Sequence, residues 1–212
     1  MTDDYQKDRE RRDREYLEEL ILALLFLVGR ETDLLCGGQS TVPQWREQII
    51  TGIKDGHSAA LAIGACVANG SDFNQSSVTL VDEIGGEVIG AGEDRFLVDF
   101  ATDIQTGRYT DEVGELKSSS IKSRADLYAY KLRATAMQAF VQQSPVGTEF
   151  DWILDDGAHH CEGNGGMNCP DIAGSGPYTS DTIPTYPASG ATPCLTNCRC
   201  SLVRKTDGYQ FG

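Results

Sequence analysis

The sequence predicts a mainly α-helical protein that ends in an irregular, cysteine-rich and zinc-stabilised knuckle. Apolar residues recur at helical spacing in separate stretches before residue 145, whereas Gly, Pro, Cys, Ser and Thr dominate from residue 151 onward. With 212 residues, of which 40% are hydrophobic, the chain can bury the core of one principal domain. We therefore expect four parts: a charged, then apolar N-terminal helix (1–30), a helical body (31–150), the knuckle (151–203) and a short tail (204–212).

The N-terminal helix changes character along its length. Residues 3–19 alternate acidic and basic side chains, as on a solvated helix supported by pairs three and four apart. Residues 16–28 are apolar on nearly every side, which indicates enclosure by the fold or by another chain. We take Leu20, Leu24 and Leu27 as candidate partner-binding residues. The uncharged apolar run has about half of the roughly 20 residues that a membrane-spanning helix needs, so no such segment is predicted.

A second helix is predicted over residues 44–68. Thr41 and Pro43 supply a capping residue and a proline near its start. Its segment 57–65 is rich in small residues, and this composition predicts close packing against another helix.

Two further helices complete the predicted body. Apolar residues recur at helical spacing from Phe96 to Ile104, and Gly107 is placed to end that helix. The next helix begins at Ser119 or Ser120 and runs to about Gln142. The glycines at 85, 86, 90 and 92 lack the GxGxxG order of a phosphate-binding loop, so we expect a turn there and no nucleotide site.

The net charge and the N-terminal sequence limit the kinds of partner and the compartment that we expect. Thirty-two acidic against 18 basic residues give a net charge of −14, which opposes broad attachment to DNA or anionic lipid and leaves only local DNA contact open. The N-terminus has no features of a secretory signal, so we expect a protein made and kept in a cytoplasm. A cytoplasm keeps thiols reduced, and this favours metal binding over disulfides.

Five of the seven cysteines crowd into the knuckle. Zinc prefers four tetrahedral thiolate or imidazole ligands, often supplied as two short clusters separated by a loop. Our first choice of metal ligands is Cys161, Cys169, Cys198 and Cys200, with Cys194 or His160 as alternates. One or two disulfides, or free thiols, are the alternative interpretation.

A catalytic interpretation competes with the structural one. His160 and Glu162, followed by Cys194 and Cys198, approach the H-x-E…P-C-x-x-C pattern of zinc deaminases. Glu162 would then move protons at a zinc ion held by His160, Cys194 and Cys198. Because the two cysteines lie four residues apart instead of three, we favour a structural metal and no enzymatic activity.

The C-terminal half resembles a known family. Trp152, His160, Cys161 and Cys169, followed by residues 176–178 and 197–200, match in order the C-terminal end of tailed-phage minor head proteins, the Mu F-like head morphogenesis family. The stretches at 96–107 and 123–129 resemble the paired helices that precede that module, so the resemblance covers about residues 90–203.

The resemblance implies a structural role. It implies a minor head (capsid) protein of a tailed bacteriophage, assembled in the host cytoplasm and present in the virion near the portal or the inner capsid surface. Its expected partners are the portal protein, the major capsid protein or further copies of the chain, with no membrane involved. The long spacing from Cys161 to Cys169 departs from the family pattern, so the ligand set stays open.

Overall fold

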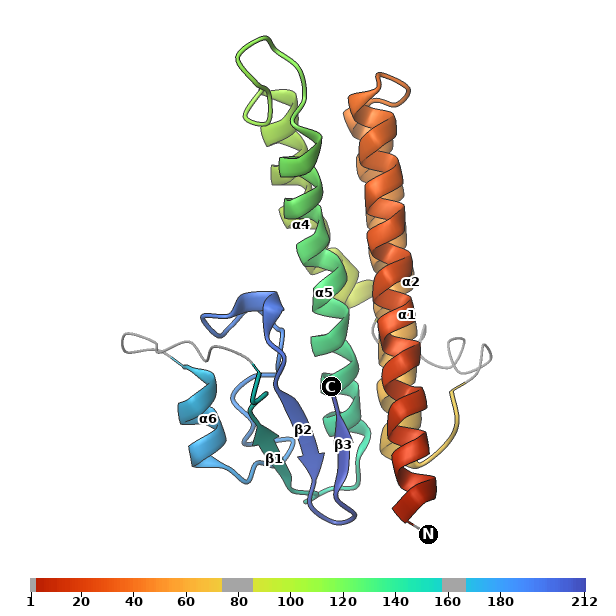
Figure 1. The fold of residues 1–212 in the computed structure, drawn as a ribbon, viewed down its shortest axis with the longest axis vertical. Coiled ribbons are helices and arrows are strands. Elements are labelled where there is room, and N and C mark those ends of the chain that lie inside the picture. Colours follow the sequence, from red (N-terminus) through yellow and green to blue (C-terminus); the bar gives the residue numbers. More distant parts are fainter. Residues whose placement is uncertain (1–2, 74–85, 158–166) are drawn as a thin grey trace.

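The computed structural model describes residues 3–73, 86–157 and 167–212, and it confirms a mainly helical fold. Four long helices form an elongated bundle, and a small sheet with one short helix lies beside one end of it (Figure 1). The helices are α1 (Asp3–Cys36), α2 (Val42–Asn69), α4 (Gly86–Gln105), α5 (Ser118–Gln143) and α6 (Cys169–Ser175). The remaining elements are a 3-10 turn, η1 (Leu195–Asn197), and the strands β1 (Phe150–Ile153), β2 (Ser201–Arg204) and β3 (Tyr209–Phe211).

The start of α2 follows from local chemistry. The Thr41 backbone N–H donates to Gln44 Oε1 at 2.9 Å, and the Gln44 backbone N–H donates to Thr41 Oγ1 at 3.4 Å. This reciprocal capping satisfies two amides that the helix cannot pair itself. The predicted capping role of Thr41 is confirmed, and Gly70 ends the helix in the left-handed region, at φ 71°.

The predicted partner-binding residues of α1 do not all face solvent. Leu24 is only 4% exposed and belongs to the core, so its assignment to a partner surface is wrong. Leu20 and Leu27 are half-buried and pack against that core. The exposed apolar side chains are Leu22 and Phe26, at 63% and 73%. A helix that is apolar on all sides does not reveal in its sequence which face its neighbours cover.

Helix α4 begins ten residues before Phe96, so the turn expected at its glycines is wrong for Gly86, Gly90 and Gly92. Gly85 lies outside the described residues. A glycine inside a helix costs only about 1 kcal/mol relative to alanine. Helix formation is cooperative, so a segment anchored downstream by buried Leu97 extends back through such positions.

Helices α2 and α5 pack at short range. A Cβ atom placed on Gly64 would lie 2.0 Å from the Ala136 carbonyl oxygen and 2.8 Å from Ala139 Cβ. The predicted close packing of the small-residue segment is therefore confirmed. The N-cap of α5 is Lys117, which makes no side-chain cap, so the helix begins one or two residues before the start predicted at Ser119 or Ser120.

The predicted tail is part of a sheet. The strands pair antiparallel in the order β1-β2-β3, so Leu202 lies beside both Trp152 and Phe211. The rings of Phe150, Tyr209 and Phe211 lie 5.3, 6.0 and 5.5 Å from the ring of Phe140 in α5. The sheet thus shares the hydrophobic core of the bundle.

Buried polar contacts also hold the end of the chain. Tyr209 Oη donates to Asp13 Oδ2 at 2.5 Å, and Arg204 donates to the Ala68 carbonyl at 2.9 Å. Burial raises the pKa of Asp13, against the hydrogen bond from Tyr209 and the charge of Arg9, which lower it. These contacts join β2 and β3 to the two N-terminal helices. No helix in the described ranges has a stretch long and apolar enough to cross a bilayer.

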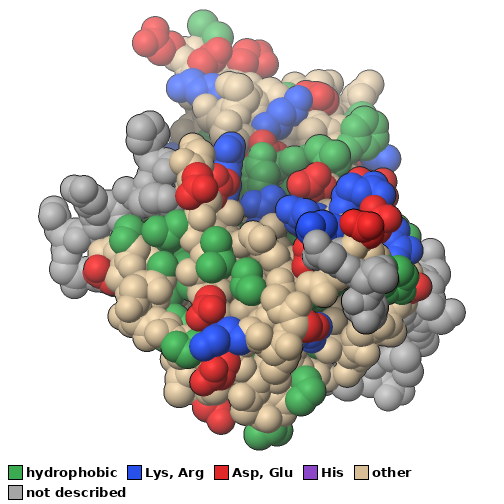
Figure 2. Space-filling model, turned by 60° about the horizontal axis from the view of Figure 1, so that its bottom comes forward, with side chains coloured by type: hydrophobic (Ala, Val, Ile, Leu, Met, Phe, Trp, Pro, Cys, Tyr) green, Lys and Arg blue, Asp and Glu red, His purple; other side chains and the backbone are tan. Residues whose placement is uncertain are grey.

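The surface around this end mixes both signs of charge. On the face shown in Figure 2, acidic and basic side chains lie among one another, with hydrophobic side chains in small patches between them. This face therefore has no single-sign field over its whole area.

His57 in α2 makes the stability of the bundle sensitive to acid. Its Nδ1 lies 2.8 Å from Thr135 Oγ1 of α5, and Nε2 has no hydrogen-bond partner within the described residues. Burial, and then the charge of Lys131, lower the pKa of His57 to about 4. The unfolded chain, with a histidine pKa near 6.5, binds the proton first, so stability is lost as the pH falls from about 6.5 to about 4.

We expect the titration of His57 to lower the free energy of unfolding by about 2.5 kcal/mol between pH 7 and pH 4.5. Urea unfolding at the two pH values measures the loss. His57→Asn retains a polar partner for Thr135 but cannot titrate, so its loss over the same interval should be smaller by that amount. Equal pH dependence in both proteins would contradict the assignment.

Candidate metal centre

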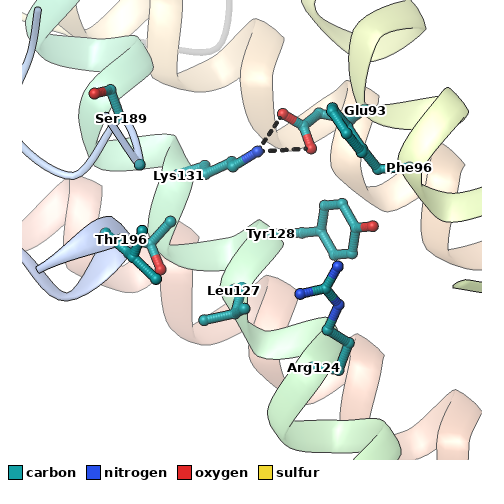
Figure 3. A pocket seen from close by; sticks show the side chains of 10 residues that line it. Glu93, Phe96, Arg124, Leu127, Tyr128, Lys131, Ser189 and Thr196 are labelled. Atoms are coloured by element: carbon teal, nitrogen blue, oxygen red, sulfur yellow. Dashed lines mark hydrogen bonds and ion pairs between the residues drawn. The ribbon is translucent and has the colours of Figure 1, made fainter. Parts of the chain in front are cut away.

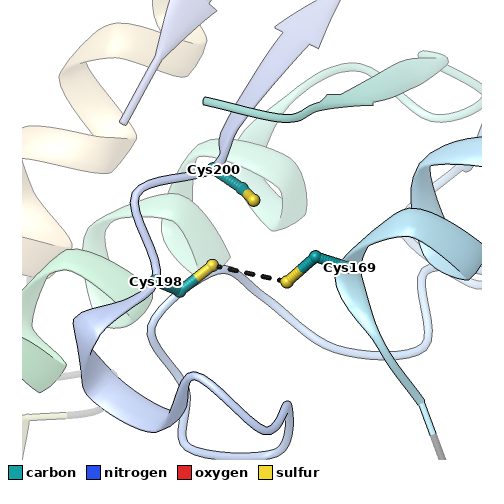
Figure 4. A group of neighbouring side chains, drawn as sticks. All are labelled: Cys169, Cys198 and Cys200. Atoms are coloured by element: carbon teal, nitrogen blue, oxygen red, sulfur yellow. Dashed lines mark hydrogen bonds between the residues drawn. The ribbon is translucent and has the colours of Figure 1, made fainter. Parts of the chain in front are cut away.

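Three cysteines of the C-terminal region converge on one point. The Sγ atoms of Cys169, Cys198 and Cys200 lie within 4.8 Å of one another, and the three residues are 2%, 2% and 3% exposed (Figure 4). Cys169 Sγ and Cys198 Sγ are 3.7 Å apart. A zinc–sulfur bond of about 2.3 Å gives a tetrahedral edge of about 3.8 Å, so the donor type and spacing fit a zinc ion.

Local structure places each thiol. The Asn168 side chain caps α6 by accepting from the Asp171 backbone N–H at 2.8 Å, and Cys169 is the first residue of that helix. Cys198 follows η1, and its carbonyl accepts a long hydrogen bond of 3.5 Å from Arg133 of α5. Cys200 directly precedes β2, whose pairing with β1 fixes its position.

A fourth sulfur lies beside the cluster. Cys194 Sγ is 3.6 Å from Cys169 Sγ and 3.1 Å from Thr192 Oγ1, but Cys194 is not one of the three mutually close thiols. The predicted ligand Cys161, the alternate His160 and the proton shuttle Glu162 lie outside the described residues. The structure therefore brings together three residues of the first-choice set, with the alternate Cys194 adjacent to them.

The thiols strongly influence one another's protonation. Burial, reinforced by the neighbouring Cys198 and Cys194, raises the pKa of Cys169 to about 12. The contact with Cys200 and burial raise the pKa of Cys198, whereas the pKa of Cys200 is lowered, first by a hydrogen bond from Cys198. Several buried thiolates cannot coexist here without positive charge, and a divalent cation supplies that charge.

Trp152 is a contributor that the sequence did not single out as part of the site itself. It is 2% exposed on β1, and its indole N–H makes no regular hydrogen bond within the described residues. It lies close enough to the Cys200 sulfur to help lower the pKa of that thiol. This role follows from the position of Trp152 in the sheet, where it pairs with Leu202, two residues after Cys200.

No disulfide joins the cysteines that the structure describes. The two closest sulfur pairs, at 3.6 and 3.7 Å, are far from the S–S bond length of about 2.05 Å, and the cysteines of the described ranges are unpaired. A buried, sulfur-only donor set can hold a metal ion. No family model matches the chain, and comparisons with curated proteins and with solved structures also give no match.

Proposed function

We propose that this chain is a non-enzymatic structural protein whose C-terminal region is held together by a zinc ion. The observation that carries the proposal is the burial of Cys169, Cys198 and Cys200 at one point. Structural zinc sites are closed and rich in thiolates, whereas catalytic sites keep a position open for water. Zinc would cross-link α6 to the chain that enters β2.

The residues around the cluster have distinct roles in this proposal. Cys169 fixes α6, while Cys198 and Cys200 fix the chain that enters β2. The fourth ligand is Cys194 or a donor from residues 158–166. Trp152 stabilises the Cys200 thiolate, and ligands oriented in this way bind metal more tightly.

We further propose that the protein acts as a minor head protein of a tailed phage, located in the virion near the portal or the inner capsid surface. The resemblance over residues 90–203 and the net charge of −14, which favours protein partners over DNA, support this role. The exposed Leu22 and Phe26 on α1 supply an apolar contact for a portal or capsid subunit.

Particle composition tests the role. We expect the protein to be found in purified phage particles from cells that carry its gene, and deletion of the gene to leave defective heads in electron micrographs. The double variant Leu22→Ser, Phe26→Ser should enter particles about tenfold less, since apolar anchor residues dominate binding energy. Val113→Ser is the control, because Val113 is 82% exposed in the loop between α4 and α5.

Each outcome bears on a separate part of the proposal. Absence of the wild-type protein from particles and from head precursors would overturn the head assignment. Normal incorporation of the double variant would overturn only the docking role of Leu22 and Phe26. Neither result affects the zinc proposal, which metal analysis tests independently.

A further inference from the structure

Cys194 is more accessible to solvent than the three cysteines beside it. Cys169, Cys198 and Cys200 are 2%, 2% and 3% exposed, whereas Cys194 is only half-buried. The oxidation of a cysteine depends on its exposure as well as on its thiolate character. A small oxidant in solution therefore reaches Cys194 before it reaches the other three thiols.

Cys194 also has a second thiol within reach. Its Sγ lies 3.6 Å from Cys169 Sγ, so only a small approach of the two atoms is needed to form an S–S bond of about 2.05 Å. Cys169 Sγ is almost as close to Cys198 Sγ, at 3.7 Å, but both of these residues are buried. Exposure therefore selects Cys194 as the partner of Cys169 in oxidation.

Local backbone geometry fixes the position of Cys194. Thr192 Oγ1 lies 3.1 Å from Cys194 Sγ, and the Leu195 backbone N–H donates to the Thr192 carbonyl at 2.8 Å. Leu195 has φ 52°, in the left-handed region that leucine rarely adopts, although its side chain is 51% exposed and gains little burial from this conformation. Such strain is typical of functional sites, and the feature that this turn holds in place is Cys194 beside Cys169.

The turn that follows Cys194, η1, is only partly packed against the bundle. Thr196 of η1 and Leu127 and Lys131 of α5 line a cavity of about 270 Å³ (Figure 3). Close-packed interiors resist even small shifts. The space beside η1 lets Cys194 approach Cys169 without displacing core side chains.

We propose that Cys194 is a site of oxidative modification through which peroxide removes a ligand from the metal centre, an inference that rests on the proposed zinc site. Hydrogen peroxide oxidises the Cys194 thiol to a sulfenic acid and leaves one molecule of water. The Cys169 thiolate then attacks the Cys194 sulfur and displaces hydroxide, which takes up a proton. Overall, the two cysteines lose two electrons to form a disulfide, and one peroxide becomes two molecules of water. Cys169 can then no longer bind zinc, and the metal is released.

Peroxide treatment of the zinc-loaded, full-length protein tests the proposal. A metal-binding dye follows the release of zinc, and peptide mapping by mass spectrometry identifies the disulfides that form. We expect the disulfide between Cys169 and Cys194 to be at least about tenfold more abundant than any other, and to appear together with the free zinc. A thiol reductant should reverse both changes.

Cys194→Ser and Cys36→Ser form a matched pair, because each replaces a half-buried cysteine. Cys36→Ser should release zinc at the wild-type rate, since Cys36 ends α1 and is not part of the thiol cluster. Cys194→Ser should release its bound zinc about tenfold more slowly, and Cys169 should form no disulfide in it. The disulfide measurement decides the result even if Cys194→Ser retains no zinc.

The possible outcomes separate this proposal from the zinc site itself. A wild-type protein that holds no zinc would overturn both. A zinc-loaded protein that keeps its metal in peroxide, or loses it through a disulfide that does not include Cys194, would overturn only the oxidation of Cys194. Zinc release by Cys194→Ser at the wild-type rate would have the same consequence.

Discussion

Cys198→Ser is expected to abolish stoichiometric zinc binding and to destabilise the C-terminal sheet. Cys198 lies between the other two thiols in the chain and is 3.7 Å from Cys169 Sγ, so its loss removes one ligand and leaves its partners buried. Structural zinc contributes about 10–16 kcal/mol of apparent binding energy in small zinc domains. Because this sheet also packs on the bundle, we expect a smaller loss, of about 4 kcal/mol or more in unfolding free energy.

Metal analysis and chelation measure this directly. Under reducing conditions, we expect about one zinc per wild-type chain and a clear fall in unfolding temperature on addition of a chelator. Cys198→Ser should contain little zinc and should not respond to the chelator. Cys36→Ser, which replaces a cysteine of α1 far from the cluster in sequence, should behave like the wild type.

The zinc proposal would be contradicted if the wild-type protein contained no zinc and its mass showed that hydrogens had been lost to disulfides. It would also contradict the proposal if Cys198→Ser kept one zinc and the same chelator response. Parallel measurements on Cys194→Ser and Cys161→Ser identify the fourth ligand, because only the variant that lacks it should lose zinc.

The helical part of the fold could be predicted because its signals are local. Thr41 and Pro43 mark the start of α2 through capping chemistry that involves only near neighbours in the chain. The small residues around Gly64 likewise indicated a close helix contact. They could not identify α5 as the partner, because that depends on the tertiary arrangement.

The C-terminal hairpin could not be predicted for a physical reason. Strand β3 has only three residues, too few for an alternating pattern to stand out. Phe150 and Phe211 meet around Phe140 although they are 61 positions apart (211 − 150) in sequence. Contacts of such long range leave no local signal in a stretch as short as 209–211.

The candidate site was predicted in its chemistry but not in its geometry. Five crowded cysteines indicated metal ligands, and three of the four first-choice residues do converge. The choice between Cys161 and Cys194 depends on where the intervening loops place each sulfur, which spacing does not determine. Leu24 was assigned to a partner for a similar reason, since composition shows that a helix is enclosed but not by what.

Gly64→Val is expected to cost about 4 kcal/mol or more of unfolding free energy, at the upper end of the range for overpacked cores. A Cβ atom at this position would lie 2.0 Å from the Ala136 carbonyl oxygen, which belongs to the backbone and cannot rotate away. Helices α2 and α5 would have to separate, and the contacts of neighbouring core residues such as Ile63 would be lost with them.

Substitution at a second glycine separates this packing effect from helix propensity. A Cβ on Gly29 of α1 meets nothing within 4 Å, so Gly29→Ala should stabilise the protein by up to about 1 kcal/mol. Gly64→Ala gains the same propensity but meets the same carbonyl, so its stability should fall between that of the wild type and that of Gly64→Val. Chemical denaturation of the four proteins gives the order. If Gly64→Ala were as stable as Gly29→Ala, the helices could not be as close as the structure places them, and the close packing of α2 on α5 would be refuted.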